Sequence, residues 1–174
     1  MSGKTGKQTT GDNQPKASIV LLLPRPFVIG ETILRAALSK AWGTDFSTNT
    51  GFELVLPMME GHLYTVLNRG AVFNYHNIPS AYFPDSDAVA RYIRGDDDLA
   101  NNVRYHEAWL SFDVVTSTRP LCEQYDLIGS VLAELAPEQT VALYVVEREV
   151  LIRFDTERRE QLKGPNTFHK LGFE

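Results

Sequence analysis

The sequence predicts an α+β fold made of two pseudo-symmetric βαββ units that form a mixed or antiparallel sheet, with the helices packed on one face. The first observation is that a dipeptide occurs twice, as Arg25-Pro26 and Arg119-Pro120, at the start of two similar stretches. The second is that apolar residues follow both dipeptides at i, i+1, i+4, i+5 and i+8, which is the spacing of one buried helical face. The third is the order of apolar runs, one before each helix and at least two after it, which indicates a strand, a helix and further strands.

The repeated helical pattern lies at the same offset from each dipeptide. Its positions are Ile33, Leu34, Ala37, Leu38 and Ala41 in the first stretch, and Leu127, Ile128, Val131, Leu132 and Leu135 in the second. The sequence therefore predicts an internal duplication.

The first unit covers residues 17–77. Residues 17–23 are a continuous apolar run, as expected of a strand that is covered on both faces. A helix over residues 28–42 ends at Gly43, because glycine favours the position after a helix. A meander of strands follows, with short turns between the runs 52–58, 63–67 and 71–76.

The second unit covers residues 105–155, after an insertion at residues 78–104. The insertion is irregular at first and then predicts two short helices, the first of which has Asp85 or Ser86 as its cap. The second unit itself predicts a strand to about Val115, a helix over Leu121–Leu135 and a hairpin made of residues 140–146 and 149–154.

The two ends of the chain differ from this compact region. Residues 1–16 contain no aliphatic side chain after Met1, and we expect a flexible tail there. Residues 156–174 are rich in charge and predict a charged C-terminal tail. A single α+β domain is therefore expected over residues 17–155.

Composition excludes several classes of protein. The net charge is −5 and the pI is about 5.4, so the broad basic field of a sequence-independent nucleic-acid binder is absent. Cys122 is the only cysteine, so no intrachain disulfide can form. The longest apolar run, residues 19–23, is too short to cross a bilayer, and the N-terminus lacks the apolar core of a signal peptide. We expect a cytoplasmic protein without a membrane or nucleic-acid partner.

Several short segments occur in an order that resembles a known family. They are the hairpin of residues 63–77, the segment 78–84, the tripeptide His106-Glu107-Ala108, the apolar helix before Pro137 and the strand 141–146. In this order the chain resembles a family of uncharacterised, mainly bacterial domains of unknown function. The resemblance covers most of residues 17–155 and implies no activity, ligand or catalytic residue.

Histidine and carboxylate residues are candidates for acid-base chemistry. His76 or His106 could act with a nearby carboxylate, Glu107 or Asp113, in a small hydrolase-like enzyme. The alternative for His106 is a hydrogen-bonded residue at the edge of the core, because it lies on the same side of its strand as several apolar residues. No metal site and no cofactor are expected.

Two arginines are candidates for ligand binding. Arg25 and Arg119 each lie between a strand and the start of a helix, and pseudo-symmetry could bring them together on an anion or a nucleotide. The alternative is that each arginine fixes its own strand-to-helix connection.

Aromatic residues around the insertion favour a third kind of function. Tyr75, Tyr82, Phe83 and Tyr92 could anchor a protein partner, although they could equally cover the sheet. Since no convergent catalytic set is visible, a non-catalytic binding or protein-interaction module is the leading hypothesis. A homodimer through a sheet edge or the insertion is also expected.

Overall fold

The computed structural model describes residues 16–173, which form a seven-stranded antiparallel sheet with helices on both sides. The order across the sheet is β2-β3-β4-β5-β1-β6-β7. The strands are β1 (Ser18–Leu23), β2 (Glu53–Met59), β3 (Leu63–Asn68), β4 (Ala71–Ile78), β5 (Ala108–Thr116), β6 (Ala142–Val145) and β7 (Val150–Arg153). The helices are α1 (Glu31–Trp42), α2 (Ser86–Tyr92), α3 (Asp97–Tyr105), α4 (Leu121–Leu135), α5 (Thr156–Leu162) and α6 (Thr167–Lys170), with a 3-10 turn η1 (Val146–Arg148). The predicted α+β class is confirmed, and the tail predicted at residues 1–16 lies, except for Lys16, outside the described residues.

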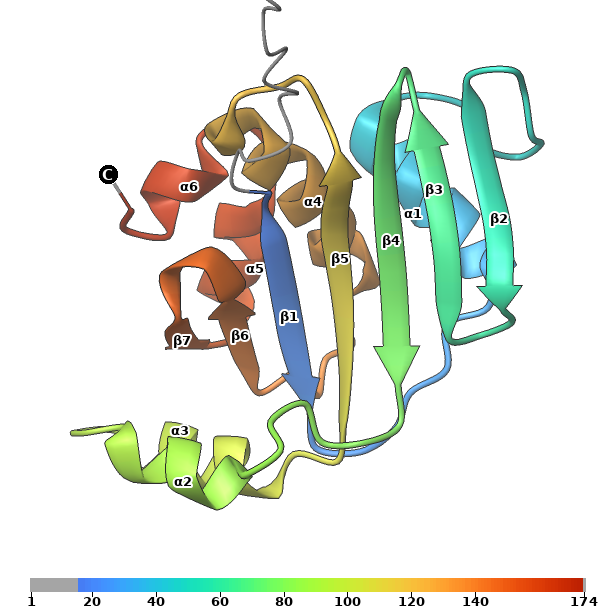
Figure 1. The fold of residues 1–174 in the computed structure, drawn as a ribbon. Coiled ribbons are helices and arrows are strands. Elements are labelled where there is room, and N and C mark those ends of the chain that lie inside the picture. The colour runs from blue at the N-terminus through green and yellow to red at the C-terminus, as the bar shows by residue number, and fades with distance from the viewer. Residues whose placement is uncertain (1–15, 174) are drawn as a thin grey trace, which may run out of the picture.

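The centre of the sheet is the antiparallel pair β1 and β5. Leu23 pairs with Ala108 and Ser18 pairs with Asp113, so the end of one strand lies beside the start of the other. Each strand leads into a long helix, and α1 and α4 lie side by side on the same face (Figure 1). The indole N–H of Trp42 in α1 donates to the carbonyl of Leu127 in α4 at 3.0 Å, which ties the two helices together.

The connections after these two helices differ. After α1 the chain goes to the edge of the sheet and returns through β2, β3 and β4, whereas after α4 it enters β6 beside β1 and leaves through β7. The first strand after each helix therefore holds a different place in the sheet. In both units a central strand leads into a helix, and the two helices contact each other, whereas an internal duplication stays a prediction.

The main core fills the space between the sheet and α1 and α4. Alternate residues of the strands point toward these helices, including Leu21, Phe73, Tyr75 and Phe112, none of which has exposed surface. Trp42 packs against Phe73 and Phe112, with ring centroids 5.1 and 5.9 Å apart.

The last segment of the chain belongs to this core. Residues 156–173 were expected to form a charged tail, but α5 and α6 pack on α4, as the red helices of Figure 1 show. Leu162, Phe168 and Leu171 are buried, although they lie among the charged residues of the segment. Average charge conceals such a pattern, because a few buried side chains are enough to fix a short helix onto a larger one.

The insertion packs against the other face of the sheet. The helical hairpin of α2 and α3 covers β1, β5 and β6 at one end, where Val20, Leu22, Leu99 and Val103 form a second buried cluster. The faces of β2, β3 and β4 that point away from α1 have no helix over them (Figure 1). In the part of the chain that the structure describes, every helix is too short or too polar to span a bilayer.

Candidate functional site

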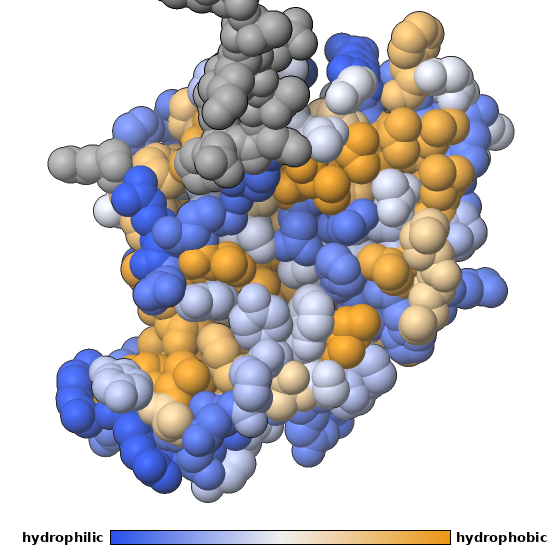
Figure 2. Space-filling model, in the orientation of Figure 1, coloured by the Kyte–Doolittle hydropathy of each residue, from blue (hydrophilic) through white to orange (hydrophobic). Residues whose placement is uncertain are grey.

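The uncovered part of the sheet is the first candidate for a functional surface, and we call it the open face. It consists of the outward residues of β2, β3 and β4 with their neighbours on β5, and it is the face turned to the reader in Figure 2. The apolar members are Leu54, Leu56, Leu63, Leu67, Val72 and Ile78, and the polar members are Thr65, Asn74, His76, Ser111 and Asp113.

The polar members lie in register across four strands. Asp113 pairs with Ser18 on one side and with Asn74 on the other, and Asn74 pairs with Thr65. The Thr65 hydroxyl donates to Asn74 Oδ1 at 3.1 Å, and the Ser18 hydroxyl donates to Asp113 Oδ1. A polar row therefore crosses the middle of the open face, and apolar residues flank it.

His76, which pairs with Ser111 in the register next to this row, is the residue of the open face suited to acid-base chemistry. Its Nδ1 lies 2.9 Å from Asp113 Oδ2 and 3.2 Å from the Ser111 hydroxyl, and that hydroxyl donates to the same carboxylate oxygen at 2.6 Å. The imidazole also packs against Trp109, with ring centroids 5.8 Å apart. A carboxylate at Nδ1 fixes the orientation of the ring and favours the tautomer in which Nδ1 donates its proton to the carboxylate oxygen. Nε2 is then the nitrogen that is available to a ligand or a substrate.

This arrangement is a His-Asp pair rather than a catalytic triad. Both serines bind the carboxylate, and no described residue forms a hydrogen bond with Nε2, where the nucleophile of a triad would lie. The pair could activate a water molecule or hold a hydrogen-bonding ligand.

His106 and Glu107 lie elsewhere and do not join this pair. They precede β5, at the end of the sheet opposite the Ser18–Asp113 pairing. His106 is buried, its Nδ1 lies 2.6 Å from the Val103 carbonyl, and its Nε2 accepts from the Tyr82 N–H at 2.8 Å. Burial lowers the pKa of His106, so the neutral ring acts as a connection between the insertion and β5. Glu107 is exposed.

The two arginine candidates are at opposite ends of the sheet. Arg25 follows the end of β1, and Arg119 follows the end of β5, and these two strands are antiparallel. Antiparallel pairing of the two central strands forces this separation, so Arg25 and Arg119 do not share a site. Arg119 pairs with Glu123 at 3.3 Å and lines a cavity of about 340 Å³ with Arg69 from the turn between β3 and β4.

The aromatic candidates divide into buried and exposed residues. Tyr75 is fully buried in the main core, where its ring lies near those of Tyr64 and Phe112. Tyr82 and Phe83 cover the sheet, with ring centroids 5.8 and 5.3 Å from that of Tyr144. Burial raises the pKa of Tyr82. Tyr92 is 84% exposed, so it is the one member of the predicted set that a partner could contact freely.

Sequence reasoning missed Ser18, Ser111 and Glu147. Ser111 and Asp113 are two positions apart in one strand and therefore point to the same side, which is a signal that the sequence contains. Ser18 and His76 reach that carboxylate only through strand pairing, which no local pattern reveals. Glu147, in η1, accepts a hydrogen bond from the Tyr125 hydroxyl, and burial raises the pKa of its carboxyl.

No group of residues 16–173 has the histidine, cysteine and carboxylate ligands that a metal ion needs. The aspartates at the start of α3 have other partners, since Asp96 caps the helix and both Asp96 and Asp98 pair with Arg153. The hydrogen bond from Arg153 lowers the pKa of Asp96.

Comparison of the chain with protein-family models, with curated proteins and with solved structures found no match.

Proposed function

We propose that this chain is a non-catalytic protein-interaction module that binds its partner through the open face. The observation that carries the proposal is the composition of the outward positions of β2, β3 and β4. In an antiparallel sheet with one solvated face, these positions are expected to be polar. Here Leu54 and Leu56 lie on β2, Leu63 and Leu67 on β3, and Val72 and Ile78 on β4.

Burial of this surface would be favourable, because each apolar side chain removed from water contributes to binding. Orange surface in Figure 2 lies over these strands, and blue surface separates it into parts. The polar row and the adjacent His76 would set the orientation of the partner, since a polar group left unpaired in the interface weakens binding. The partner we expect is a protein with an apolar contact surface and one hydrogen-bonding group that faces His76 Nε2.

The backbone edge of β2 supports binding through the face rather than through the edge. At the edge of β2 that is not paired with β3, the backbone N–H of Val55 donates to Asn49 Oδ1 at 3.0 Å, and the Val55 carbonyl accepts from Arg35 at 3.2 Å. Pro57 lies two residues further along the same edge and has no N–H to donate. These contacts block strand addition in the way that natural edge strands often do. A homodimer through the β2 edge is therefore less favoured than a contact through the open face.

A site-specific crosslinking experiment tests this proposal. A photoreactive amino acid is placed at Leu56, which is 39% exposed on the open face, and in a matched control at Ile33, which is 54% exposed on α1. We expect a discrete protein adduct from position 56 that is lost when Leu67→Asp is added, and no such adduct from position 33. Circular dichroism of the Leu67→Asp variant checks that it is folded. Equal adducts from both positions, or none from position 56, would contradict the proposal.

A second candidate function is proton-transfer catalysis at His76, and the observation that favours it is the 2.9 Å contact with Asp113. A hydrolase of this kind would use Nε2 to take a proton from water. In a screen of ester and phosphoester substrates, His76→Ala should abolish any turnover that the wild type shows, whereas His169→Ala, a change in the exposed histidine of α6, should retain it. Turnover that survives His76→Ala would exclude this assignment.

A further inference from the structure

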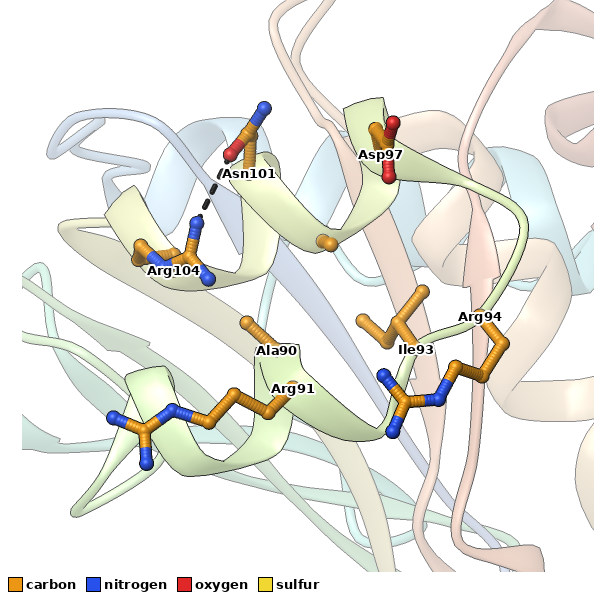
Figure 3. A pocket seen from close by; sticks show the side chains of 8 residues that line it. Ala90, Arg91, Ile93, Arg94, Asp97, Asn101 and Arg104 are labelled. Carbon is orange, nitrogen blue, oxygen red and sulfur yellow. Dashed lines mark hydrogen bonds between the residues drawn. The ribbon is translucent and has the colours of Figure 1, made fainter.

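The helical hairpin of α2 and α3 contains a groove with an unusual set of charges. The groove has a volume of about 590 Å³ and lies between the two helices (Figure 3). Ala90, Ile93 and Ala100 provide an apolar floor, and Arg91, Arg94 and Arg104 surround it. Figure 3 shows Arg91 and Arg94 extending from α2 and its continuation, and Arg104 extending from α3.

The arginines of the groove differ in how they are held. Arg104 donates to Asp87 at 2.8 Å and to Asn101 Oδ1 at 3.1 Å, so its position is fixed. Arg91 and Arg94 are exposed, and neither forms a hydrogen bond or an ion pair with any residue in the described part of the chain.

The acidic residues nearby are mostly bound to other groups. Asp85 caps α2, and Asp96 and Asp98 pair with Arg153 of β7. Asp97 is the one carboxylate among the residues that line the groove, and in Figure 3 it points away from the guanidinium groups. The residues that line the groove thus include three arginines and one carboxylate. Arg104 is neutralised by Asp87, so the charges free to attract a ligand are those of Arg91 and Arg94.

We propose that this groove binds an acidic segment of a partner protein. Carboxylates of the segment would pair with Arg91 and Arg94, which can each form two parallel hydrogen bonds to a carboxylate, while an apolar side chain would lie on Ala90 and Ala100. Tyr92 follows Arg91 in the chain, Tyr105 follows Arg104, and the two tyrosines are 84% and 68% exposed. Tyrosine and arginine are among the residues that most often dominate the binding energy of protein interfaces.

The observations favour a peptide over a nucleic acid. A nucleic-acid site needs positive charge along a path of phosphates, whereas the cations here are limited to one short hairpin of an acidic protein. This inference goes beyond the proposed function and does not depend on the open face, because the groove is formed by the insertion.

Fluorescence anisotropy with a short labelled peptide of glutamate and leucine tests the inference. Three proteins are compared: the wild type, Arg91→Ala/Arg94→Ala, and the control Arg25→Ala/Arg119→Ala. Both double variants change the net charge from −5 by two arginines, to −7, so a general electrostatic effect is the same in both. A peptide with glutamine in place of glutamate tests the need for charge, and an oligodeoxythymidylate tests the alternative ligand.

We expect the wild type to bind the acidic peptide. The groove variant should bind it with an affinity at least about ten-fold lower, since two charge-assisted contacts are removed. The control variant should bind like the wild type, the glutamine peptide should not bind, and Leu67→Asp on the open face should leave peptide binding unchanged. No binding by the wild type, equal weakening in both double variants, or tighter binding of the oligonucleotide would each overturn the inference. Thermal unfolding of every variant confirms that it is folded.

Discussion

His106 gives a prediction that separates a structural histidine from a catalytic one. The residue lies between the insertion and β5, and both ring nitrogens form hydrogen bonds, with the Val103 carbonyl at 2.6 Å and the Tyr82 N–H at 2.8 Å. Replacement by alanine leaves both backbone groups without a partner at a site where His106 itself is 3% exposed. Each unsatisfied buried group costs about 1–3 kcal/mol, so for the two groups together we expect His106→Ala to lower the free energy of unfolding by about 2–6 kcal/mol.

The same residue predicts a dependence of stability on pH. Burial lowers the pKa of His106 in the folded state, whereas the unfolded chain has an ordinary histidine pKa of about 6.5. As pH falls below that value, the unfolded state takes up a proton that the folded state does not, so the folded state loses stability until its own lowered pKa is reached. Above that value both states are neutral, and this contribution to stability is fully present.

Urea denaturation at a series of pH values between 8 and 5 measures both effects, with wild type compared with His106→Ala and with the non-titrating His106→Gln. The difference in free energy of unfolding between the wild type and His106→Gln should be largest at the highest pH of the series. It should decrease as pH falls below the histidine pKa of the unfolded chain. A His106→Ala variant as stable as the wild type at high pH, or an advantage that grows toward low pH, would refute the reasoning.

Two further predictions concern α4 and its contacts. Gly129→Ala should destabilise the protein by about 1–2 kcal/mol in urea denaturation despite the better helix propensity of alanine, because the added Cβ would lie 3.0 Å from the Leu162 carbonyl and from Thr167 Cγ2. The control Gly51→Ala, at a position outside the left-handed region and with no atom within 4 Å of the new Cβ, should not destabilise the protein. Glu147→Gln should raise the melting temperature at neutral pH, because burial raises the pKa of Glu147 and its charge is costly in the folded state. This gain should disappear as pH falls through the raised pKa, where the folded wild type becomes protonated first, and a gain that persists at low pH would contradict this reasoning.

Local patterns in the sequence predicted the elements better than their arrangement. The helical spacing of residues 33–41 and 127–135 identified the buried sides of α1 and α4, since Leu34, Leu38, Ile128 and Leu132 are all fully buried. The runs at 52–58, 63–67 and 71–76 correspond to β2, β3 and β4 within one or two residues. These features depend on residues close in sequence, so periodicity reports them directly.

Strand order and the candidate site depend on distant residues, and for that reason the sequence could not determine them. A pairing of β5 with both β1 and β4 brings Ser18, His76 and Asp113 together, although they belong to three separate strands. The same pairing separates Arg25 from Arg119, which the repeated dipeptide had suggested could meet. For His76 the candidate carboxylates included Asp113, but the choice between Asp113 and Glu107 required the register of β4 against β5.

The polar residues of the open face would make binding through its apolar residues selective for particular protein partners. The carboxylate of Asp113 accepts hydrogen bonds from Ser18, Ser111 and His76, so its charge is satisfied within the sheet. A surface that covered His76 without supplying a partner for its Nε2 would leave this nitrogen unpaired in the interface, which weakens binding, whereas a surface with a suitable donor or acceptor would satisfy it. The apolar residues of β2, β3 and β4 would then provide the affinity, while His76 would discriminate among partners.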